Sequence, residues 1–336
     1  MKRLPSPWRL AAAVAGLAVA TFLVLWLAPS GDYLILPDEA HPVAPLVSIR
    51  GTRVAQEDDG IYFVDVIQRR ATLLESLFPE IREGATLLPG SQVNPPGVSD
   101  GTRRRVDLRQ MARSQEIAAA VALRELGHKV DVREDGALVV AVAPHAPAAK
   151  VLIPTDVIVG AEGRRVRSPA ELRQIVSSLR PGQVVTLLVR GDTGLRTVRV
   201  RTIADPSAPE RALIGVLVQP AARIHLPLDV RIDSGNVGGP SAGLAFALAV
   251  MEKLGRDVDH GQRVAATGQI ELDGSVTAVG AIKQKVLGVH RAGIRVFLVP
   301  KANAAEARRY ADGLRVIPVE SLRQALRALA TGAFRP

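Results

Sequence analysis

The sequence RIDSGNVGGPSAGLAFALAVMEKL, residues 231–254, decides how the C-terminal part of the chain folds. Glycines crowd its first half, where they allow a tight turn and a close approach of the backbone to another group. The apolar run that follows predicts a helix. Ser241 falls at or near the start of this helix, where backbone N–H groups of Gly239 and Ser241 could stabilise an oxyanion formed by attack of the hydroxyl. An ordinary helix-capping serine explains the fragment alone more simply.

A second stretch, GAIKQKVLGVHRAG at residues 280–293, predicts a helix that ends at glycine. At about 100° per residue, its apolar side chains lie on one arc; Lys285 falls inside this arc and Lys283 outside it. Because burial of an ammonium group is costly, such a lysine reaches solvent, pairs with a carboxylate or loses its proton. Desolvation lowers the pKa of a lysine, and a neutral amine near Ser241 could act as a general base.

The two segments together resemble the proteolytic domain of Lon proteases. GGPSAG at 238–243 matches the nucleophile motif of that family, although a glycine replaces the usual Asp before Gly-Pro-Ser. TGQIELDGSVTAVGAIKQK at 267–285 matches the motif whose second lysine is the base, with Ala281 in place of a glycine. The resemblance implies a Ser241/Lys285 dyad, supported by a hydrogen bond from Thr267. The nearest group is the YlbL-like set of membrane-anchored PDZ–Lon proteins.

Residues 127–205 predict a small β-rich module with one helix at 170–178. The segment from His145 to Gly163 is similar to the PDZ domains of bacterial proteases, with Thr155 where glycine is usual. PDZ domains bind extended peptides by adding a strand to a sheet edge. We therefore expect a groove between that helix and the strand at 138–142, with peptide contacts at Leu138, Val139 and Val140. A purely structural insert is the alternative.

The segment before this module predicts a strand at 61–67, an exposed loop at 84–105 and a helix at 107–126. Lon proteolytic domains also have a strand and a helix ahead of the serine segment. The resemblance therefore implies that residues 46–126 and the catalytic portion, 207–334, pack as one α+β unit that the PDZ-like module interrupts. A linear array of three domains is the plainer alternative.

The N-terminal segment predicts a single transmembrane helix over residues 9–28. Leu10 to Ala28 contains 19 uncharged residues, preceded by Lys2, Arg3 and Arg9. Such a helix is about 28 Å long, close to the hydrocarbon thickness of a bilayer. The basic flank favours a cytoplasmic N-terminus and an extracytoplasmic catalytic domain at the cell membrane. A cleaved signal peptide is the alternative.

The rest of the composition excludes several classes of function. The chain has no cysteine, its six histidines are dispersed, and no GxxxxGK[ST] motif occurs, so we expect no metal, no nucleotide and no other cofactor. Aromatic residues are only 3% of the chain and no nucleic-acid motif is present, despite a net charge of +10. These features favour an ATP-independent serine endopeptidase that acts on extracytoplasmic or membrane-proximal polypeptides. A non-catalytic, membrane-anchored peptide-binding scaffold is the alternative, and the Lon resemblance implies a ring-shaped homo-oligomer.

Overall fold

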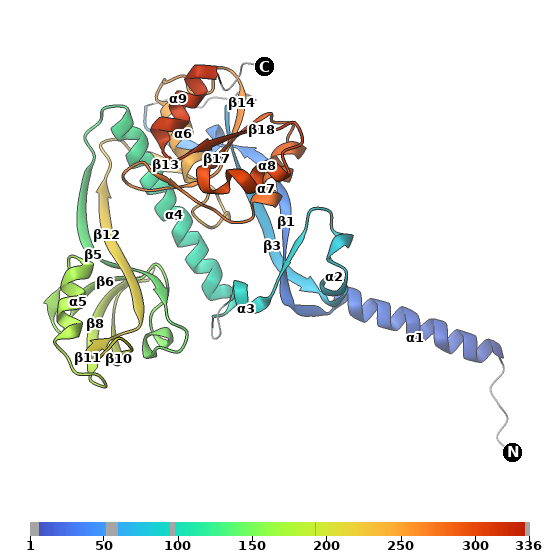
Figure 1. Cartoon of the computed structure of the whole chain (residues 1–336), viewed down its shortest axis with the longest axis horizontal. Helices are drawn as coiled ribbons and strands as arrows, with labels where there is room; N and C mark the ends of the chain where they lie inside the picture. The colour runs from blue at the N-terminus through green and yellow to red at the C-terminus, as the bar shows by residue number, and fades with distance from the viewer. Residues whose placement is uncertain (1–6, 52–59, 95–97, 192, 333–336) are drawn as a thin grey trace.

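The computed structural model describes residues 7–51, 60–94, 98–191 and 193–332. They form a protease-like body, a PDZ-like module and a projecting N-terminal helix (Figure 1). The helices are α1 (Pro7–Leu27), α2 (Leu73–Leu77), α3 (Gly90–Val93), α4 (Asp100–Glu125), α5 (Pro169–Ser177), α6 (Gly243–Lys253), α7 (Ile282–Arg291), α8 (Ala304–Arg309) and α9 (Leu322–Gly332).

The body is built on one mixed six-stranded sheet. Its order is β18 (Arg315–Val319), β17 (Val296–Pro300), β14 (Arg263–Ala266), β3 (Gly60–Thr72), β1 (Pro29–Pro42) and β4 (Thr86–Leu88). The strands from β18 to β3 are parallel, whereas β1 and β4 are antiparallel to their neighbours. Short pairs flank the sheet: β2 (Val47–Ile49) with β13 (Val230–Ile232), and β15 (Gln269–Ile270) with β16 (Val276–Thr277).

The side chains of β3 alternate between the two faces of this sheet, and both faces are packed against helices. Ile61 and Phe63 join the core around α6, α4 and α9, whereas Tyr62 and Val64 join the core around α7 and α8. The α6 helix is buried on nearly all sides, as its almost uniformly apolar sequence requires. Since β3 lies between β14 and β1, residues from both sides of the PDZ-like module form one sheet and one core.

Residues 84–105 differ from the predicted exposed loop. They contain β4 and α3, and α4 begins at Asp100 rather than near 107, because the Ser99 hydroxyl accepts the Thr102 N–H and caps it. The Gly, Pro, Asn and Ser residues of this stretch predict a loop, and residues 95–97 of it lie outside the described ranges. The basic end of the stretch instead forms the first turns of a 26-residue helix, whose later residues pack against α6.

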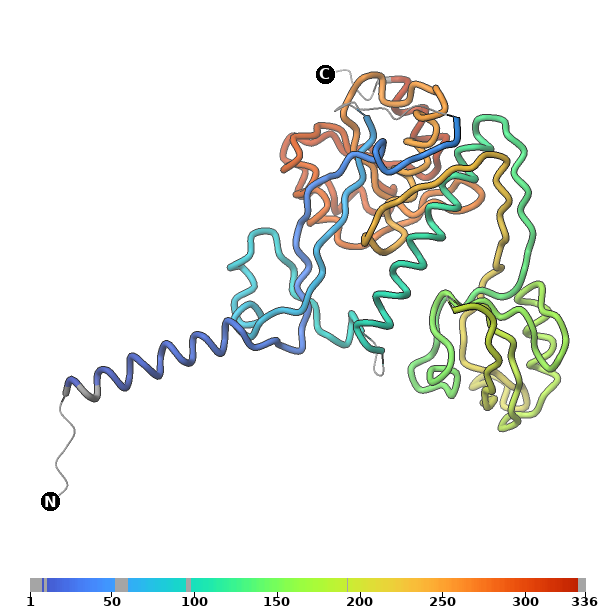
Figure 2. Tube along the Cα trace, turned by 180° about the vertical axis from the view of Figure 1, so that it is seen from behind, coloured from blue at the N-terminus to red at the C-terminus, as the bar shows by residue number. Residues whose placement is uncertain are grey.

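The PDZ-like module is built on a six-stranded sheet, and the long strands β5 and β12 of this sheet extend as a two-stranded ribbon to the body (Figure 2). Its order is β12 (Val216–His225), β5 (Asp131–Val142), β6 (Val157–Ala161), β8 (Val184–Gly191) and β9 (Gly194–Arg201), and β7 (Arg164–Arg165) pairs with β6. A small sheet of β10 (Ile203–Asp205) and β11 (Ala208–Leu213) follows β9. Ala212 and Ile214 pack in the core of the module. The module therefore extends beyond residue 205, into the start of the predicted 207–334 portion. Residues 333 and 334 of that portion lie outside the described ranges.

The ribbon and α4 connect the module to the body. Strands β5 and β12 pair along most of their length, from Val142 with Val216 to Asp131 with His225. From α4, Arg109 donates to the Thr155 hydroxyl at 3.0 Å and pairs with the fully buried Asp156. The module is thus held to the body by the ion pair with α4 as well as by the two strands of the ribbon.

The α1 helix projects from the body, and its apolar side chains from Val14 to Leu27 are largely exposed (Figure 1). Within the described residues, no helix reaches the combination of length and apolar character that crossing a membrane requires. The predicted transmembrane helix is therefore not confirmed by the structure.

Ala281 adopts a left-handed backbone conformation, φ 58° and ψ 38°, immediately before α7. This conformation costs a non-glycine residue about 1–2 kcal/mol, and glycine is the residue that the Lon motif usually has here. We expect Ala281→Gly to raise the free energy of unfolding by about 0.5–1 kcal/mol, after the greater entropy of unfolded glycine is subtracted. Ala292→Gly, at the right-handed C-cap of the same helix, should lower it. Denaturant unfolding of both variants tests the pair; a destabilised Ala281→Gly would contradict the expectation.

Candidate active site

Ser241 lies in the turn between β13 and α6, two residues before the helix begins. The turn is held by α4 through two hydrogen bonds: the Gly239 N–H donates to the Asp107 carbonyl at 2.8 Å, and the Ser114 hydroxyl donates to the Pro240 carbonyl at 3.0 Å. Gly239 has φ 84°, which favours glycine at that position. The serine is therefore presented by a turn that a long helix fixes from behind.

The Ser241 backbone carbonyl is held by residues of the second motif. It accepts the Gly268 N–H at 2.8 Å and the Thr267 hydroxyl at 3.1 Å. Thr267 is fully buried, and its own N–H bonds to Leu298 of β17. Thr267 therefore positions the backbone of the serine rather than the side chain of either dyad member.

Lys285 projects from α7 toward this turn, and its residue is only 3% exposed. Its Nζ atom donates to Ser241 Oγ at 2.9 Å and to the Val64 carbonyl of β3 at 2.6 Å. Burial lowers the pKa of Lys285 to about 8, against a smaller opposing effect of the Asp65 carboxylate. Lys283 points elsewhere and donates to the Ala85 carbonyl. The structure therefore brings the hydroxyl of Ser241 together with an amine that loses its proton near neutral pH.

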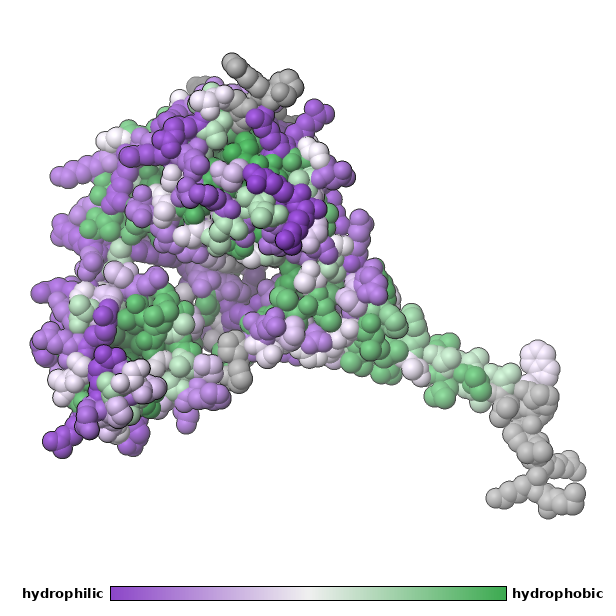
Figure 3. All heavy atoms as spheres, viewed as in Figure 1, coloured by the Kyte–Doolittle hydropathy of each residue, from purple (hydrophilic) through white to green (hydrophobic). Residues whose placement is uncertain are grey.

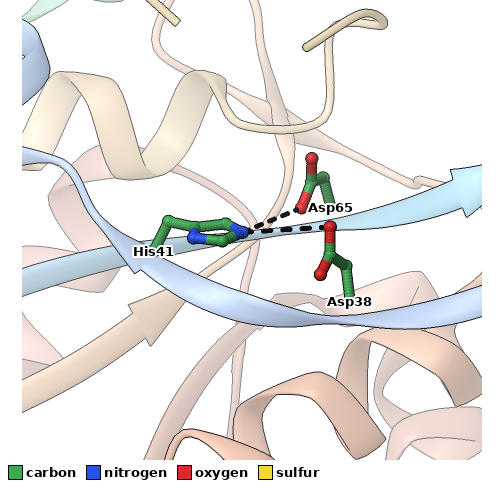
Figure 4. Close-up of side chains that lie close together, drawn as sticks. All are labelled: Asp38, His41 and Asp65. Atoms are coloured by element: carbon green, nitrogen blue, oxygen red, sulfur yellow. Dashed lines mark ion pairs between the residues drawn. The ribbon is translucent and has the colours of Figure 1, made fainter.

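A cluster that the sequence did not reveal lies on the neighbouring strands. His41 and Asp38 of β1 face Asp65 of β3, with His41 Nε2 3.7 Å from Asp65 Oδ1 and 3.9 Å from Asp38 Oδ2 (Figure 4). Burial raises the pKa of Asp65, and Asp38 adds to this effect, whereas His41 and Lys285 oppose it. Asp65 directly follows Val64, whose carbonyl binds Lys285. Through Asp65, the cluster opposes the lowering of the Lys285 pKa by burial.

We expect Asp65→Asn to move the rising limb of the pH–activity profile to lower pH. The Asp65 carboxylate favours the charged form of Lys285, so its removal lowers the pKa of the amine further and the neutral base forms at lower pH. The measurement is kcat/KM for a fluorogenic peptide from pH 6 to 10. Asp38→Asn changes a carboxylate that acts on Asp65 and not directly on Lys285, so it should shift the profile less. An unchanged or upward-shifted limb in Asp65→Asn would contradict this account.

Two predicted site assignments differ from the structure. The Gly239 N–H is committed to the Asp107 carbonyl, so it is not available to an oxyanion in this conformation. Among the described residues, the Ser241 N–H has no acceptor and remains available. Leu138, Val139 and Val140 do not form a free sheet edge, since β12 pairs with that side of β5. After the module the chain returns as β12, which pairs with the outer side of β5. The free edge of the sheet on this side is therefore β12 itself.

Comparisons with known families agree with the two resemblances. Residues 219–331 match the Lon protease (S16) C-terminal proteolytic domain, and residues 125–202 match the PDZ domain. PDZ domains of SdrC-like proteins from Listeria monocytogenes and Listeria innocua are each 25% identical to this chain. They cover 25% of it with a TM-score of 0.24, over 87% and 93% of those chains.

Two curated relatives each match about a quarter of this chain. Lon protease 1 of Myxococcus xanthus is 40% identical over 93 residues, which cover 26% of this chain and 11% of that protein. Lon protease of Clostridioides difficile is 44% identical over 81 residues, 24% of this chain and 10% of that protein. The chain thus spans about a tenth of the length of these relatives. Residues 219–331 are thus similar to the Lon-type C-terminal proteolytic domain, and residues 125–202 are similar to a PDZ domain.

Proposed function

We propose that this protein is a serine endopeptidase in which Ser241 is the nucleophile and Lys285 is the general base. The observation that carries the proposal is the 2.9 Å contact between Ser241 Oγ and the buried Nζ of Lys285. A hydroxyl needs an adjacent base to attack a carbonyl at ordinary pH, and an amine with a pKa of about 8 is partly neutral there.

The mechanism follows from this contact. Neutral Lys285 accepts the hydroxyl proton as Ser241 Oγ bonds to the peptide carbonyl carbon, and the resulting ammonium is stabilised by the Val64 carbonyl. The ammonium returns the proton to the leaving amine as the C–N bond breaks, which leaves an ester on Ser241. Water then attacks the ester with the same lysine as base, and the acid product leaves.

An oxyanion forms in each step and needs N–H donors. The Ser241 N–H is one. The Gly239 N–H becomes a second donor when the turn releases the Asp107 carbonyl, a single rotation of the backbone at a glycine with positive φ. Substrate binding against the turn would therefore complete the oxyanion site.

The PDZ domain offers a groove for extended polypeptide. The free edge of β12 and the α5 helix line a cavity of about 760 Å³. Its walls are mostly apolar, with Val142, Leu172, Val176, Ile214 and Val216 among them. A peptide that adds a strand to β12 would place alternate side chains in this cavity. This groove supports unfolded or loosely structured polypeptides as substrates.

The proposal also covers energy use, membrane attachment and assembly. The sequence has no nucleotide-binding motif, which supports turnover without ATP. The uncharged, exposed part of α1 from Val14 to Leu27, with Lys2, Arg3 and Arg9 ahead of it in the sequence, supports a single-pass anchor. The basic flank favours a cytoplasmic N-terminus and an extracytoplasmic catalytic domain at the cell membrane. Curated relatives of this chain are Lon proteases, and the assembly of several copies into a ring is proposed by that likeness alone.

Turnover of an unfolded casein by the wild-type chain and by Ser241→Ala tests the proposal. The substitution removes the nucleophile and should lower kcat/KM by about 10³-fold or more. Ser234→Ala, in the same glycine-rich segment but bonded to Gln115 instead of Lys285, is the matched control and should remain active. Equal turnover by wild type and Ser241→Ala would refute the peptidase and leave a peptide-binding scaffold.

A further inference from the structure

A patch of exposed apolar side chains lies on the body where α1 joins it. The patch consists of Leu73, Leu77 and Phe78 of the α2 turn and Ile81 of the short 3-10 helix Pro79–Ile81, which are 36%, 62%, 51% and 48% exposed. Most large apolar residues of the body are buried instead. Four such side chains within nine residues of sequence are more than the isolated apolar residues that any protein surface shows.

The local structure holds this patch rigidly. Thr72 and Glu75 form a capping box that starts α2. The Glu75 carboxylate is nearly buried between the guanidinium groups of Arg69 and Arg82, at 2.6 and 2.8 Å. These pairs hold the pKa of Glu75 far below its usual range, with hydrogen bonds from Arg69 as the largest cause. These bonds therefore hold the α2 turn that carries the patch. The charged groups of Arg69, Glu75 and Arg82 are paired with one another.

The patch is continuous with α1. The Leu73 N–H donates to the Ala28 carbonyl just after α1 at 2.9 Å, and the Arg82 guanidinium lies over the Trp26 ring, 5.9 Å from its centre. Figure 3 shows apolar surface running from the projecting helix onto the adjoining part of the body. From Ala11 to Leu27 the α1 side chains are uncharged and almost all apolar around the helix, a distribution suited to a lipid environment rather than to one face of a protein partner.

We propose that Leu73, Leu77, Phe78 and Ile81 insert into the interfacial layer of the lipid bilayer, beside the end of α1 that carries Trp26. The inference rests on the membrane anchor of the proposed function and extends it. An apolar patch next to an aromatic residue at the end of a hydrophobic helix meets the bilayer at the headgroup level. The body is then attached at two points, which fixes its orientation and the height of the Ser241 turn above the lipid.

Depth-dependent quenching tests this inference, because the chain has no cysteine and each single cysteine can be labelled alone. Full-length Leu77→Cys, Val19→Cys and Leu195→Cys proteins carry an environment-sensitive fluorophore. They are reconstituted into phosphatidylcholine vesicles with or without brominated acyl chains. The three sites are 62%, 59% and 64% exposed, so they differ in location and hardly in accessibility. Leu195 belongs to the PDZ module and is the control.

The expected result is quenching of about two-fold or more at Leu77 and Val19 in brominated vesicles, and little at Leu195. Quenching at Val19 with Leu77 equal to Leu195 would overturn the inference while the anchor stands. An unquenched Val19 would refute the anchor itself and the inference with it. Casein turnover by each labelled protein, measured in parallel, shows that the variants are folded and reports on the peptidase separately.

Discussion

Lys285→Arg should lower the turnover of an unfolded substrate by about 10³-fold or more, although the side chain stays cationic. The proposed role requires an amine that gives up its proton near neutral pH, and burial lowers the pKa of Lys285 to about 8 for this purpose. A guanidinium stays protonated at any pH at which the protein is folded. Arginine also cannot reproduce the compact donor that contacts both Ser241 Oγ and the Val64 carbonyl.

The matched control is Lys283→Arg on the same helix. Lys283 donates to the Ala85 carbonyl on the surface side of α7, so this variant should keep nearly full activity. Thermal melting of both variants separates a lost base from a lost fold. A Lys285→Arg protein that is folded and retains wild-type kcat/KM would exclude general-base catalysis by this lysine.

Residues 226–334 alone should fail to fold cooperatively, despite containing both dyad members. This fragment lacks β3 and β1, so β14 would become an exposed sheet edge, and it lacks the α4 helix that packs against α6. The serine turn would also lose its hydrogen bonds to Asp107 and Ser114. Circular dichroism and urea unfolding are expected to show no cooperative transition.

Deletion of the PDZ module is the informative counterpart. Asp131 and His225 are directly paired in the ribbon, so a short glycine-rich turn can replace residues 132–224 without moving either end. This variant retains both parts of the body and should unfold cooperatively, with hydrolysis of short peptides retained. If instead 226–334 folds stably by itself, the interrupted arrangement of the body is not needed for folding.

The sequence predicted the contact between Ser241 and Lys285 better than it predicted the surroundings of that contact. Helical periodicity alone placed Lys285 on the buried arc and Lys283 outside it, and the two side chains point accordingly. Both departures from the family patterns at glycine positions keep the backbone that glycine would adopt: Ala281 has φ 58° and Thr155 has φ 77°. The left-handed backbone at these two positions is therefore present without glycine, which the residue types alone do not show.

Contacts between distant segments could not be predicted from the sequence. Asp65 lies near Lys285, and His41 lies near Asp65, because β1 and β3 pair and pack against α7, a relation that no local pattern encodes. The pairing of β12 with β5 is likewise a contact between distant segments. Because of it, Leu138, Val139 and Val140 do not lie on the free edge of the PDZ sheet. The hydrogen bond from the Gly239 N–H to the Asp107 carbonyl depends on how α4 packs against the serine turn. The sequence alone therefore could not show which N–H groups are available to an oxyanion.

The pH dependence of kcat/KM for a fluorogenic peptide tests the central claim most directly, because it reports the ionisation of the free enzyme. The account predicts activity that rises with pH through a single ionisation of apparent pKa about 8, absent from the residual activity of Lys285→Arg. A limb near the ordinary lysine value of about 10.4, or a profile flat from pH 6 to 10, would contradict a buried amine acting as the base for Ser241.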